Sequence, residues 1–194
     1  MAKKFQNKYK TESIRLSNWD YRSNADYFVT ICTKNKKCFF GDIILNTQTK
    51  EKTMKLSEIG NLANNFWMEI PEHFPFVKLD AFVVMPNHVH GIITIDHSRD
   101  DSCIIPTEIL SIDDIPLSKN EKMAKISPKK GSLSSVIRSY KSAVTKQARQ
   151  IDSMFSWQSL YHDHIIRNPF ALHRIRKYIN NNPNNWDTDN FYLA

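Results

Sequence analysis

Hydrophobic and polar positions along the chain predict several short strands. Residues 26–33 (DYFVTICT) are rich in β-branched and aromatic side chains, which is typical of a strand. Residues 38–45 form a second, shorter extended segment. The apolar runs at 77–85 and 88–95 are separated only by Pro86-Asn87, so they predict the two strands of a β-hairpin.

Other segments have the periodicity of amphipathic helices. Residues 56–70 carry apolar side chains at three- and four-residue steps, and the proline that follows is expected to end this helix. Residues 132–150 predict a second helix with Ser132 as its N-cap and a buried stripe made of Leu133, Ile137, Tyr140 and Val144. Residues 159–167 are strand-like, and residues 169–182 predict a third helix, capped by the asparagine before it.

The order strand, strand, helix, hairpin, loop, helix, strand, helix predicts an α+β fold, in which helices pack on an antiparallel sheet. We expect a basic N-terminal arm over residues 1–25, one catalytic domain over residues 26–186 and a tail over residues 187–194. Residues 96–130 have no clear periodicity and predict a long loop within that domain.

Composition narrows the class of protein. The hydrophobic fraction of 41% is ordinary for a globular chain. Neither a membrane-spanning run nor a secretory signal is evident, and the three cysteines (Cys32, Cys38 and Cys103) lack the spacing of a metal site, so a cytoplasmic protein without a membrane partner is expected. The net charge of +7 favours a polyanionic partner such as nucleic acid.

Candidate chemistry begins with His88 and His90, two positions apart in a predicted strand. Side chains alternate between the two faces of a strand, so both imidazoles are expected on one face, close enough to bind one divalent ion. Two histidines that merely alternate on a half-exposed strand are the plain alternative. The Pro86-Asn87 break places the pair at a strand end, where a substrate could reach it.

The segment VVMPNHVHGII, residues 83–93, resembles the HUH segment of the single-tyrosine transposases, which mobilise insertion sequences through single-stranded DNA. Residues 161–168 (YHDHIIRN) and 178–183 (YINNNP) resemble the subgroup associated with repetitive extragenic palindromes (REP). The similarity extends from Tyr27 to Trp186, which is most of the chain. With it we expect a ferredoxin-like antiparallel sheet and a transposase, a metal-dependent endonuclease and strand transferase that nicks and rejoins DNA.

A tyrosine is the expected nucleophile, because its oxygen can hold the cut phosphate as an ester until the joining step. Tyr178 and Asn182 lie four positions apart on one predicted helix, so the amide oxygen can complete a metal site beside the hydroxyl. The resemblance implies the same roles, with His88, His90 and Asn182 as metal ligands. Tyr140 is the alternative nucleophile, although valine stands four positions after it.

The resemblance further implies a hairpin-containing, single-stranded DNA target and places His164 near the active site in a supporting role. Mg²⁺ or Mn²⁺ suits a mixed nitrogen and oxygen site that acts on phosphate. Basic and aromatic side chains on the helices and near the tyrosine are candidate DNA contacts: Arg138, Lys141, Arg167, Arg174 and Trp186, with Trp19 and Tyr21 as further stacking candidates.

Three alternatives remain open at this level. One is a nucleic-acid-binding module of the same fold that has lost catalysis. Another is a metal-dependent hydrolase that uses water and forms no covalent intermediate. The third concerns assembly, since both a monomer and a homodimer are compatible with the sequence.

Overall fold

The structure is a computed structural model that describes residues 4–5, 8–9, 16, 18–99 and 128–192. The central part of the predicted long loop, and Cys103 within it, therefore lies outside the described residues. Near the N-terminus, β1 (Lys4–Phe5) pairs antiparallel with β2 (Lys8–Tyr9).

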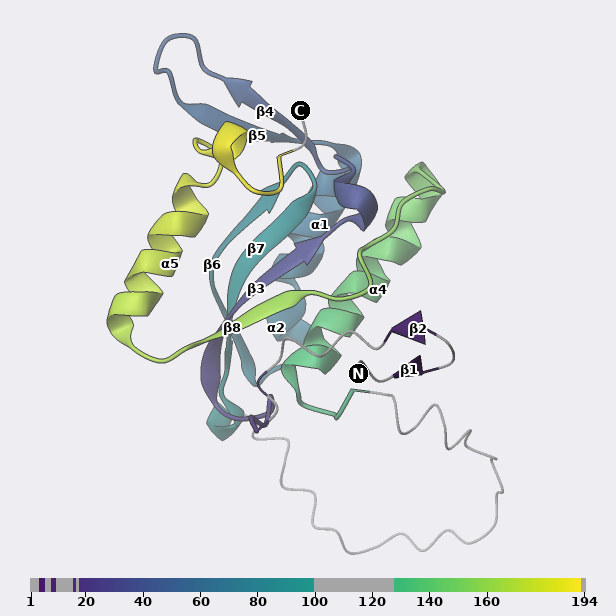
Figure 1. The fold of residues 1–194 in the computed structure, drawn as a ribbon, viewed down its shortest axis with the longest axis vertical. Helices are drawn as coiled ribbons and strands as arrows, with labels where there is room; N and C mark the ends of the chain where they lie inside the picture. The colour runs from purple at the N-terminus through teal and green to yellow at the C-terminus, as the bar shows by residue number, and fades with distance from the viewer. Residues whose placement is uncertain (1–3, 6–7, 10–15, 17, 100–127, 193–194) are drawn as a thin grey trace, which may run out of the picture.

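The main sheet has four antiparallel strands in the order β6-β7-β3-β8 (Figure 1). These strands are β3 (Ala25–Cys32), β6 (Val77–Met85), β7 (His88–Ile95) and β8 (His162–Ile166). Helix α1 (Glu58–Met68) lies between β3 and β6 in sequence, and α4 (Leu133–Ile151) lies between β7 and β8. The resulting βαββαβ order with the first and third strands in the centre is ferredoxin-like, which confirms the predicted α+β class.

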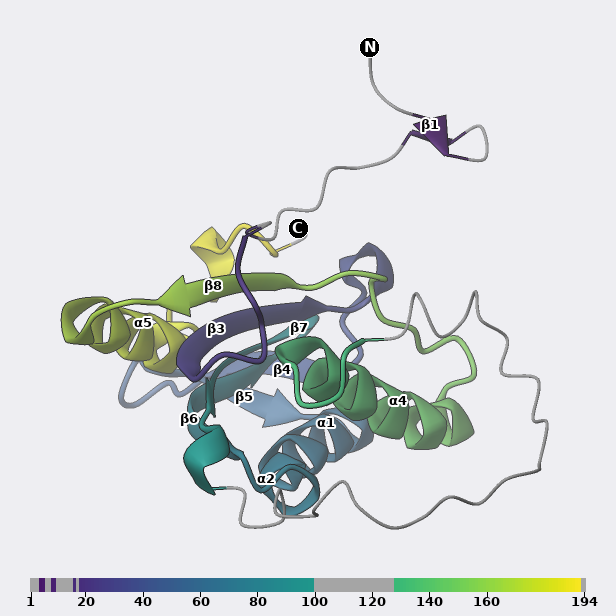
Figure 2. The same ribbon diagram turned by 90° about the horizontal axis from the view of Figure 1, so that it is seen from below.

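One face of the sheet packs against α1 and α4, and Figure 2 shows these helices together on one side of it. Alternating β3 residues, including Val29 and Ile31, point into this core. Helix α4 contributes the predicted stripe, and all four of its members are buried. Ser132 caps α4 by accepting a hydrogen bond from the Ser135 amide, as expected.

Helix α5 (Pro169–Asn181) packs on the opposite face through a smaller cluster that includes Ile92, Ile166 and Ile179. Its N-terminus is capped as predicted, because the Asn168 side chain accepts a hydrogen bond from the Ala171 amide. A bidentate contact between Arg176 and Asp80 joins α5 to the edge strand β6. With α5 packed in this way, its last turn lies at the same end of the sheet as the start of β7 (Figure 1).

Two elements differ from the prediction. Residues 52–56 form strand β5 (Lys52–Leu56), which pairs with β4 (Gly41–Leu45) in a separate hairpin, so Leu56 belongs to a strand rather than to the helix. Pro71 starts the short helix α2 (Ile70–His73) instead of only ending the preceding one, because proline is well accommodated in a first helical turn.

The remaining described elements are three short 3₁₀ turns, η1 (Lys34–Lys36), η2 (His97–Arg99) and η4 (Trp186–Thr188). Among the residues that the structure describes, no helix combines the length and the apolar character needed to cross a lipid bilayer.

Candidate active site

His88 and His90 point to the α5 face of the sheet, as the two-residue spacing predicts. They lie on β7, with Val89 between them on the opposite, core-facing side. Their ring centroids are 4.4 Å apart, and both side chains are almost completely buried. Gly91 follows on the core side, where an added Cβ would lie 2.2 Å from Cζ2 of Trp67. The α1 tryptophan thus packs directly beneath the histidine-bearing strand.

Each imidazole is held by a hydrogen bond at Nδ1. In His88, Nδ1 is 2.8 Å from Oδ1 of Asn87, whose amide nitrogen donates to the carbonyls of Lys36 and Phe191. That network makes the Asn87 oxygen an acceptor, so His88 donates from Nδ1 and keeps a lone pair on Nε2. In His90, Nδ1 is 2.9 Å from Oγ1 of Thr30 on the neighbouring strand.

Burial keeps both imidazoles neutral. It lowers the pKa of His88 to about 3, and the charge of Lys36 adds to this effect. Burial also lowers the pKa of His90 well below its ordinary value, with the neighbouring His88 as the next cause. Because a metal ion binds neutral imidazole, no proton has to be displaced from either ring near neutral pH.

Two oxygen-bearing side chains converge on the histidines. His88, His90 and Asp189 each offer a ligand atom, and these atoms all lie within 4.8 Å of one another. Asn182 is buried, and its Nδ2 donates to Oδ2 of Asp189 at 3.1 Å, which leaves its Oδ1 free to accept. The other carboxylate oxygen of Asp189 accepts from the Phe191 amide at 2.7 Å.

The donor set fits a cation. Nε2 of His88 and Oδ1 of Asn182 are both buried acceptors without a hydrogen-bond partner. Buried acceptors that face each other beside a carboxylate are costly unless a positive charge satisfies them. Two imidazole nitrogens with amide and carboxylate oxygens form a mixed set that suits a divalent ion such as Mn²⁺ or Mg²⁺. This arrangement could hold a metal ion.

Tyr178 stands at the edge of this group. Its hydroxyl is 3.2 Å from Nε2 of His90, and its ring packs edge-on against Phe28 and His90. The residue is 43% exposed, so Tyr178 lies where the site meets solvent. Burial of the remainder raises the pKa of Tyr178, and the charge of Asp189 adds to this effect. Asn182 lies one helical turn further along, at the C-cap of α5.

The segment that follows α5 forms a wall of the site rather than the tail expected from residue 187 onward. The ring centroid of Phe191 lies 4.6 Å from that of His88. Lys36 donates to the Asn190 carbonyl at 2.7 Å and lies over the Phe191 ring. Residues 186–192 are therefore anchored to η1 and to the start of β7.

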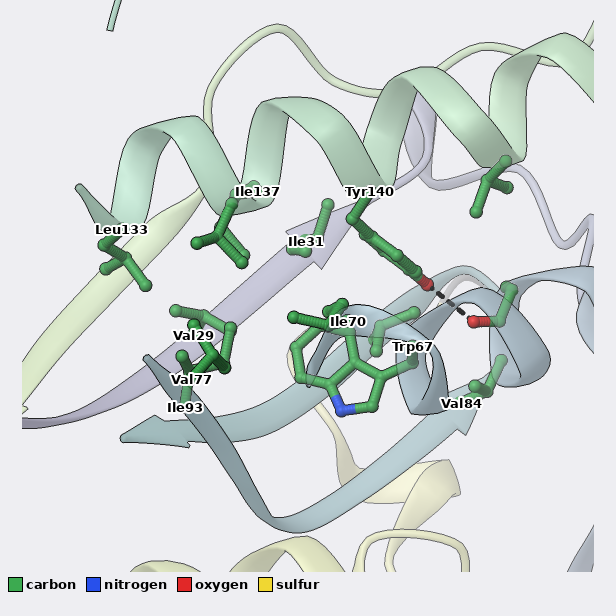
Figure 3. Close-up of a cluster of buried hydrophobic side chains, with 14 of the residues drawn as sticks. Val29, Ile31, Trp67, Ile70, Val77, Val84, Ile93, Leu133, Ile137 and Tyr140 are labelled. Carbon is green, nitrogen blue, oxygen red and sulfur yellow. Dashed lines mark hydrogen bonds between the residues drawn. The ribbon is translucent and has the colours of Figure 1, made fainter. Parts of the chain in front are cut away.

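Tyr140, the alternative nucleophile, lies in the main core on the opposite face of the sheet. Its hydroxyl donates to the Ala63 carbonyl at 3.0 Å, and its ring packs edge-on against Trp67 (Figure 3). The side chain is only 3% exposed, and burial raises its pKa strongly. A nucleophilic role for Tyr140 is therefore incompatible with this structure, because its oxygen can reach neither the histidines nor a substrate.

The aromatic residues suggested for base stacking differ in burial. Trp186 is buried, with its ring 6.0 Å from His88, so it supports the site instead of offering an open face. Trp19 donates from its indole to the Tyr27 hydroxyl, and Tyr21 packs on the main core. Trp186 therefore has almost no exposed ring surface, whereas Trp19 and Tyr21 are half-buried and a stacking role for them stays a prediction.

The basic candidates separate into two regions. Arg167 and Arg174 are both exposed. Arg167 directly follows β8, and Arg174 lies on α5, the helix that carries Tyr178. Arg138 is exposed on α4, and Lys141 is half-buried further along the same helix, on the opposite face of the sheet from the histidines. His164 is exposed on β8 and lies opposite Phe28 in the strand register.

Asp189 is not among the metal ligands predicted from the sequence, because residues 187–194 were expected to form a tail. A usable signal was present in the sequence: Trp186, Phe191 and Tyr192 follow the last helix closely, and a solvated tail rarely carries so many aromatic residues. Asp189 lies between them, so a packed segment carrying one acidic side chain was the better interpretation.

Comparison with known proteins gives one sequence relative. The chain is 39% identical, over 185 residues, to an uncharacterized protein of Haemophilus influenzae, and the match covers 93% of this chain and 92% of that protein. No family model matches the sequence.

A solved REP-associated tyrosine transposase bound to a REP hairpin is similar with a TM-score of 0.48 and 18% identity, over 89% of this chain and 74% of that one. A Deinococcus radiodurans protein gives a TM-score of 0.43 at 13% identity, over 87% of this chain and 97% of its own. From the match over nearly its whole length, the chain belongs to the same protein family as the Haemophilus influenzae protein.

Proposed function

We propose that this protein is a metal-dependent, single-strand DNA nicking and joining enzyme of the transposase type, with Tyr178 as its nucleophile. The observation that carries the proposal is the hydroxyl of the partly exposed Tyr178, 3.2 Å from Nε2 of His90 and beside buried acceptors that lack a donor. The resemblance of residues 83–93 and 178–183 to single-tyrosine transposases supports the same conclusion.

In the proposed reaction, the Tyr178 oxygen forms a bond to phosphorus while the bond from phosphorus to the 3′-oxygen breaks. The products are a 5′-phosphotyrosine and a free 3′-hydroxyl, and the exposed phenol loses its proton to solvent as the 3′-oxygen takes one up. Attack by a second 3′-hydroxyl reverses these steps and releases the tyrosine. Because the ester conserves the energy of the phosphodiester bond, joining needs no further energy source.

The histidines, Asn182 and Asp189 would hold the divalent ion, which when bound supplies positive charge to the phosphate. The residues of the chain position this chemistry in three ways. Hydrogen bonds at Nδ1 orient both imidazoles so that Nε2 faces the site. Packing of α5 fixes Tyr178 and Asn182 one turn apart. The anchored segment at Phe191 excludes water from one side of His88.

Contacts with the DNA are proposed for exposed groups around Tyr178. Arg174 precedes it by one helical turn, so its guanidinium can reach a phosphate next to the one that is cut. His164 lies on β8 opposite Phe28, whose ring contacts Tyr178, and can support the same strand. Since the cut strand must be single, a hairpin with an unpaired flank is a suitable form of substrate.

The experiment that tests the proposal compares the wild-type chain with Tyr178→Phe on labelled hairpin oligonucleotides that carry single-stranded flanks, with Mn²⁺ present. Wild-type protein should give cleaved DNA together with a band of protein covalently joined to DNA on a denaturing gel. Tyr178→Phe should lose both products by about a thousandfold or more, because phenylalanine has no oxygen that can attack phosphorus. Tyr192→Phe is a matched control, since that side chain is also partly exposed and near the site.

Two results would contradict the proposal in different ways. Cleavage without a covalent band, equal in the wild type and Tyr178→Phe, would identify a hydrolase that uses water. Tight binding of hairpins without any cleavage in Mn²⁺ or Mg²⁺ would identify a nucleic-acid-binding module.

A further inference from the structure

A basic groove lies on the far side of the sheet edge from the proposed active site. It has a volume of about 530 Å³ and runs between the second half of α4 and residues 156–159. In Figure 1 the chain leaves α4 and runs back beside it toward β8. We call this feature the α4 groove; the residues that matter for its chemistry are Lys141, Ser142, Lys146, Arg149, Trp157 and Gln158.

The α4 groove carries a concentrated positive charge. Ser142, Lys146 and Arg149 fall on one face of α4 through their three- and four-residue spacing, and all three are exposed. No carboxylate is among the residues that line it. Arg149 is held in place by a hydrogen bond from Nε to the Phe155 carbonyl at 3.1 Å, which leaves its terminal nitrogens available for an anion.

Lys141 adds a third cation at the wall of the groove. Its ammonium donates to the Gln158 carbonyl at 2.6 Å, and Trp157 donates from its indole to the Lys141 carbonyl at 3.1 Å. These contacts fix the segment 156–159 to α4, so the groove has a defined shape. Burial lowers the pKa of Lys141 to about 8, so this ammonium is desolvated and gains from a nearby anion.

The groove lies close to the histidines across the sheet edge. The Gln158 amide donates to the carbonyl of Cys32 at 2.8 Å, and Cys32 is the register partner of His88 on β7. Two strand spacings of about 4.8 Å each therefore separate the backbone of Gln158 from that of His88, or about 10 Å in all. One nucleic-acid strand can span this distance around the edge.

We propose that the α4 groove binds the phosphate backbone of the DNA strand that continues from the site of cleavage. The inference rests on the proposed function, because the strand in question is the one whose phosphate Tyr178 is proposed to attack. Three cations with a neighbouring serine hydroxyl and no lining carboxylate suit backbone phosphates and read no base. Trp157 is half-buried and packs its ring against Tyr140 and Phe155, so the proposed contact is made by the cations with the backbone.

The test measures binding of labelled oligothymidylates of increasing length at several salt concentrations. The variant Lys146→Gln/Arg149→Gln is compared with the wild type and with Lys78→Gln/Lys130→Gln, which removes the same charge from two exposed lysines outside the groove. Loss of two phosphate contacts should reduce the slope of log affinity against log salt by about 1.4 in the groove variant. The reduction should appear only with oligonucleotides long enough to pass around the sheet edge.

Several outcomes would overturn the proposal. Equal slopes in the groove variant and the control variant would show that only bulk charge matters. A larger effect on a blunt duplex than on single strands would assign the groove to a duplex stem, and full competition by inorganic phosphate alone would make it a small-anion site.

The experiment also separates this inference from the proposed function. Wild-type cleavage with an unchanged slope in the groove variant removes the groove proposal alone. A changed slope in a chain that never cleaves removes the proposed function and leaves a single-strand binding groove. Arg149 also donates a hydrogen bond to the main chain, so its replacement could destabilise the fold. The midpoint of thermal unfolding is therefore measured for each variant. If it falls in the double variant, Lys146→Glu alone is used instead.

Discussion

Thr30 and His90 face each other across β3 and β7, and Oγ1 of the threonine is 2.9 Å from Nδ1 of the histidine. Both residues are buried. When Nδ1 carries the proton and donates to Thr30, the lone pair on Nε2 points toward Tyr178 and the neighbouring oxygens. A side chain that offers no ligand of its own thus holds the orientation of a proposed ligand.

Thr30→Val should weaken Mn²⁺ binding about 10- to 100-fold, because the replacement keeps the shape and removes the acceptor at Nδ1. Isothermal titration calorimetry measures the change. Thr30→Ser retains the hydroxyl and should bind within a few-fold of the wild type. An unaltered affinity in Thr30→Val would show that packing alone orients His90.

Asp189→Asn should reduce Mn²⁺ affinity by at least tenfold, since it removes the carboxylate whose oxygen lies within 4.8 Å of the histidine nitrogens. The gain in free energy of unfolding that Mn²⁺ binding provides should decrease together with the affinity. At an ion concentration of 100 times the wild-type Kd, the wild type gains about 2.7 kcal/mol in free energy of unfolding. Asp187→Asn is the matched control, because Asp187 belongs to the same segment and pairs outward with Lys52. If the two variants bind equally, Asp189 is not a ligand.

Acid should destabilise the metal-free protein. His88 has a pKa of about 3 in the fold and an ordinary value of 6.5, so the unfolded chain binds more protons between these limits. Stability is therefore fully present above pH 6.5 and decreases as the pH falls below it. His90 acts in the same direction.

The interval from pH 6.5 down to about pH 4.5 isolates the histidines, because the carboxylates titrate mainly below it. Thermal midpoints in EDTA should fall over this interval in the wild type. They should fall much less in His88→Gln/His90→Gln. A parallel decline in both proteins would assign the acid sensitivity to other groups.

Gly91→Ala should lower the free energy of unfolding by about 1–3 kcal/mol, the range for an overpacked core. The new methyl group would lie 2.2 Å from the Trp67 ring, so either the indole or strand β7 must move. Denaturation in urea measures the loss. Trp67→Phe in the Gly91→Ala background should recover part of it, and additive effects of the two changes would contradict direct contact.

Much of the sheet could be predicted because the local sequence pattern of its strands is typical of extended structure. Alternation and β-branched residues marked β3, and the single Pro86-Asn87 break marked the β6–β7 hairpin. Strand β5 was missed because Leu56 also fits the helical repeat that follows it, and only pairing with β4 resolves the ambiguity. Pairing between distant segments leaves little trace in a single sequence.

The site was predictable to the extent that its members share a local repeat. His88 and His90 share a strand face, and Tyr178 and Asn182 share a helix, so their relative spacing follows from periods of two and 3.6 residues. Nothing local shows that Asp189 returns to the histidines after α5, or that Trp186 turns inward. Those placements depend on tertiary packing, as does the burial that removes Tyr140 from consideration.

The segment from Trp186 to Tyr192, which closes over the histidines, gives the site an order of assembly during translation. A ribosome makes the histidine strand about ninety residues before Tyr178, and it makes residues 156–159, the last part of the α4 groove, only about twenty residues before Tyr178 and about thirty before Asp189. A chain that ended between residues 160 and 177 would contain both histidines and the residues of the α4 groove, but neither Tyr178 nor Asp189. On the proposed function, such a shortened chain would keep the groove residues for DNA and lack the tyrosine that forms the ester.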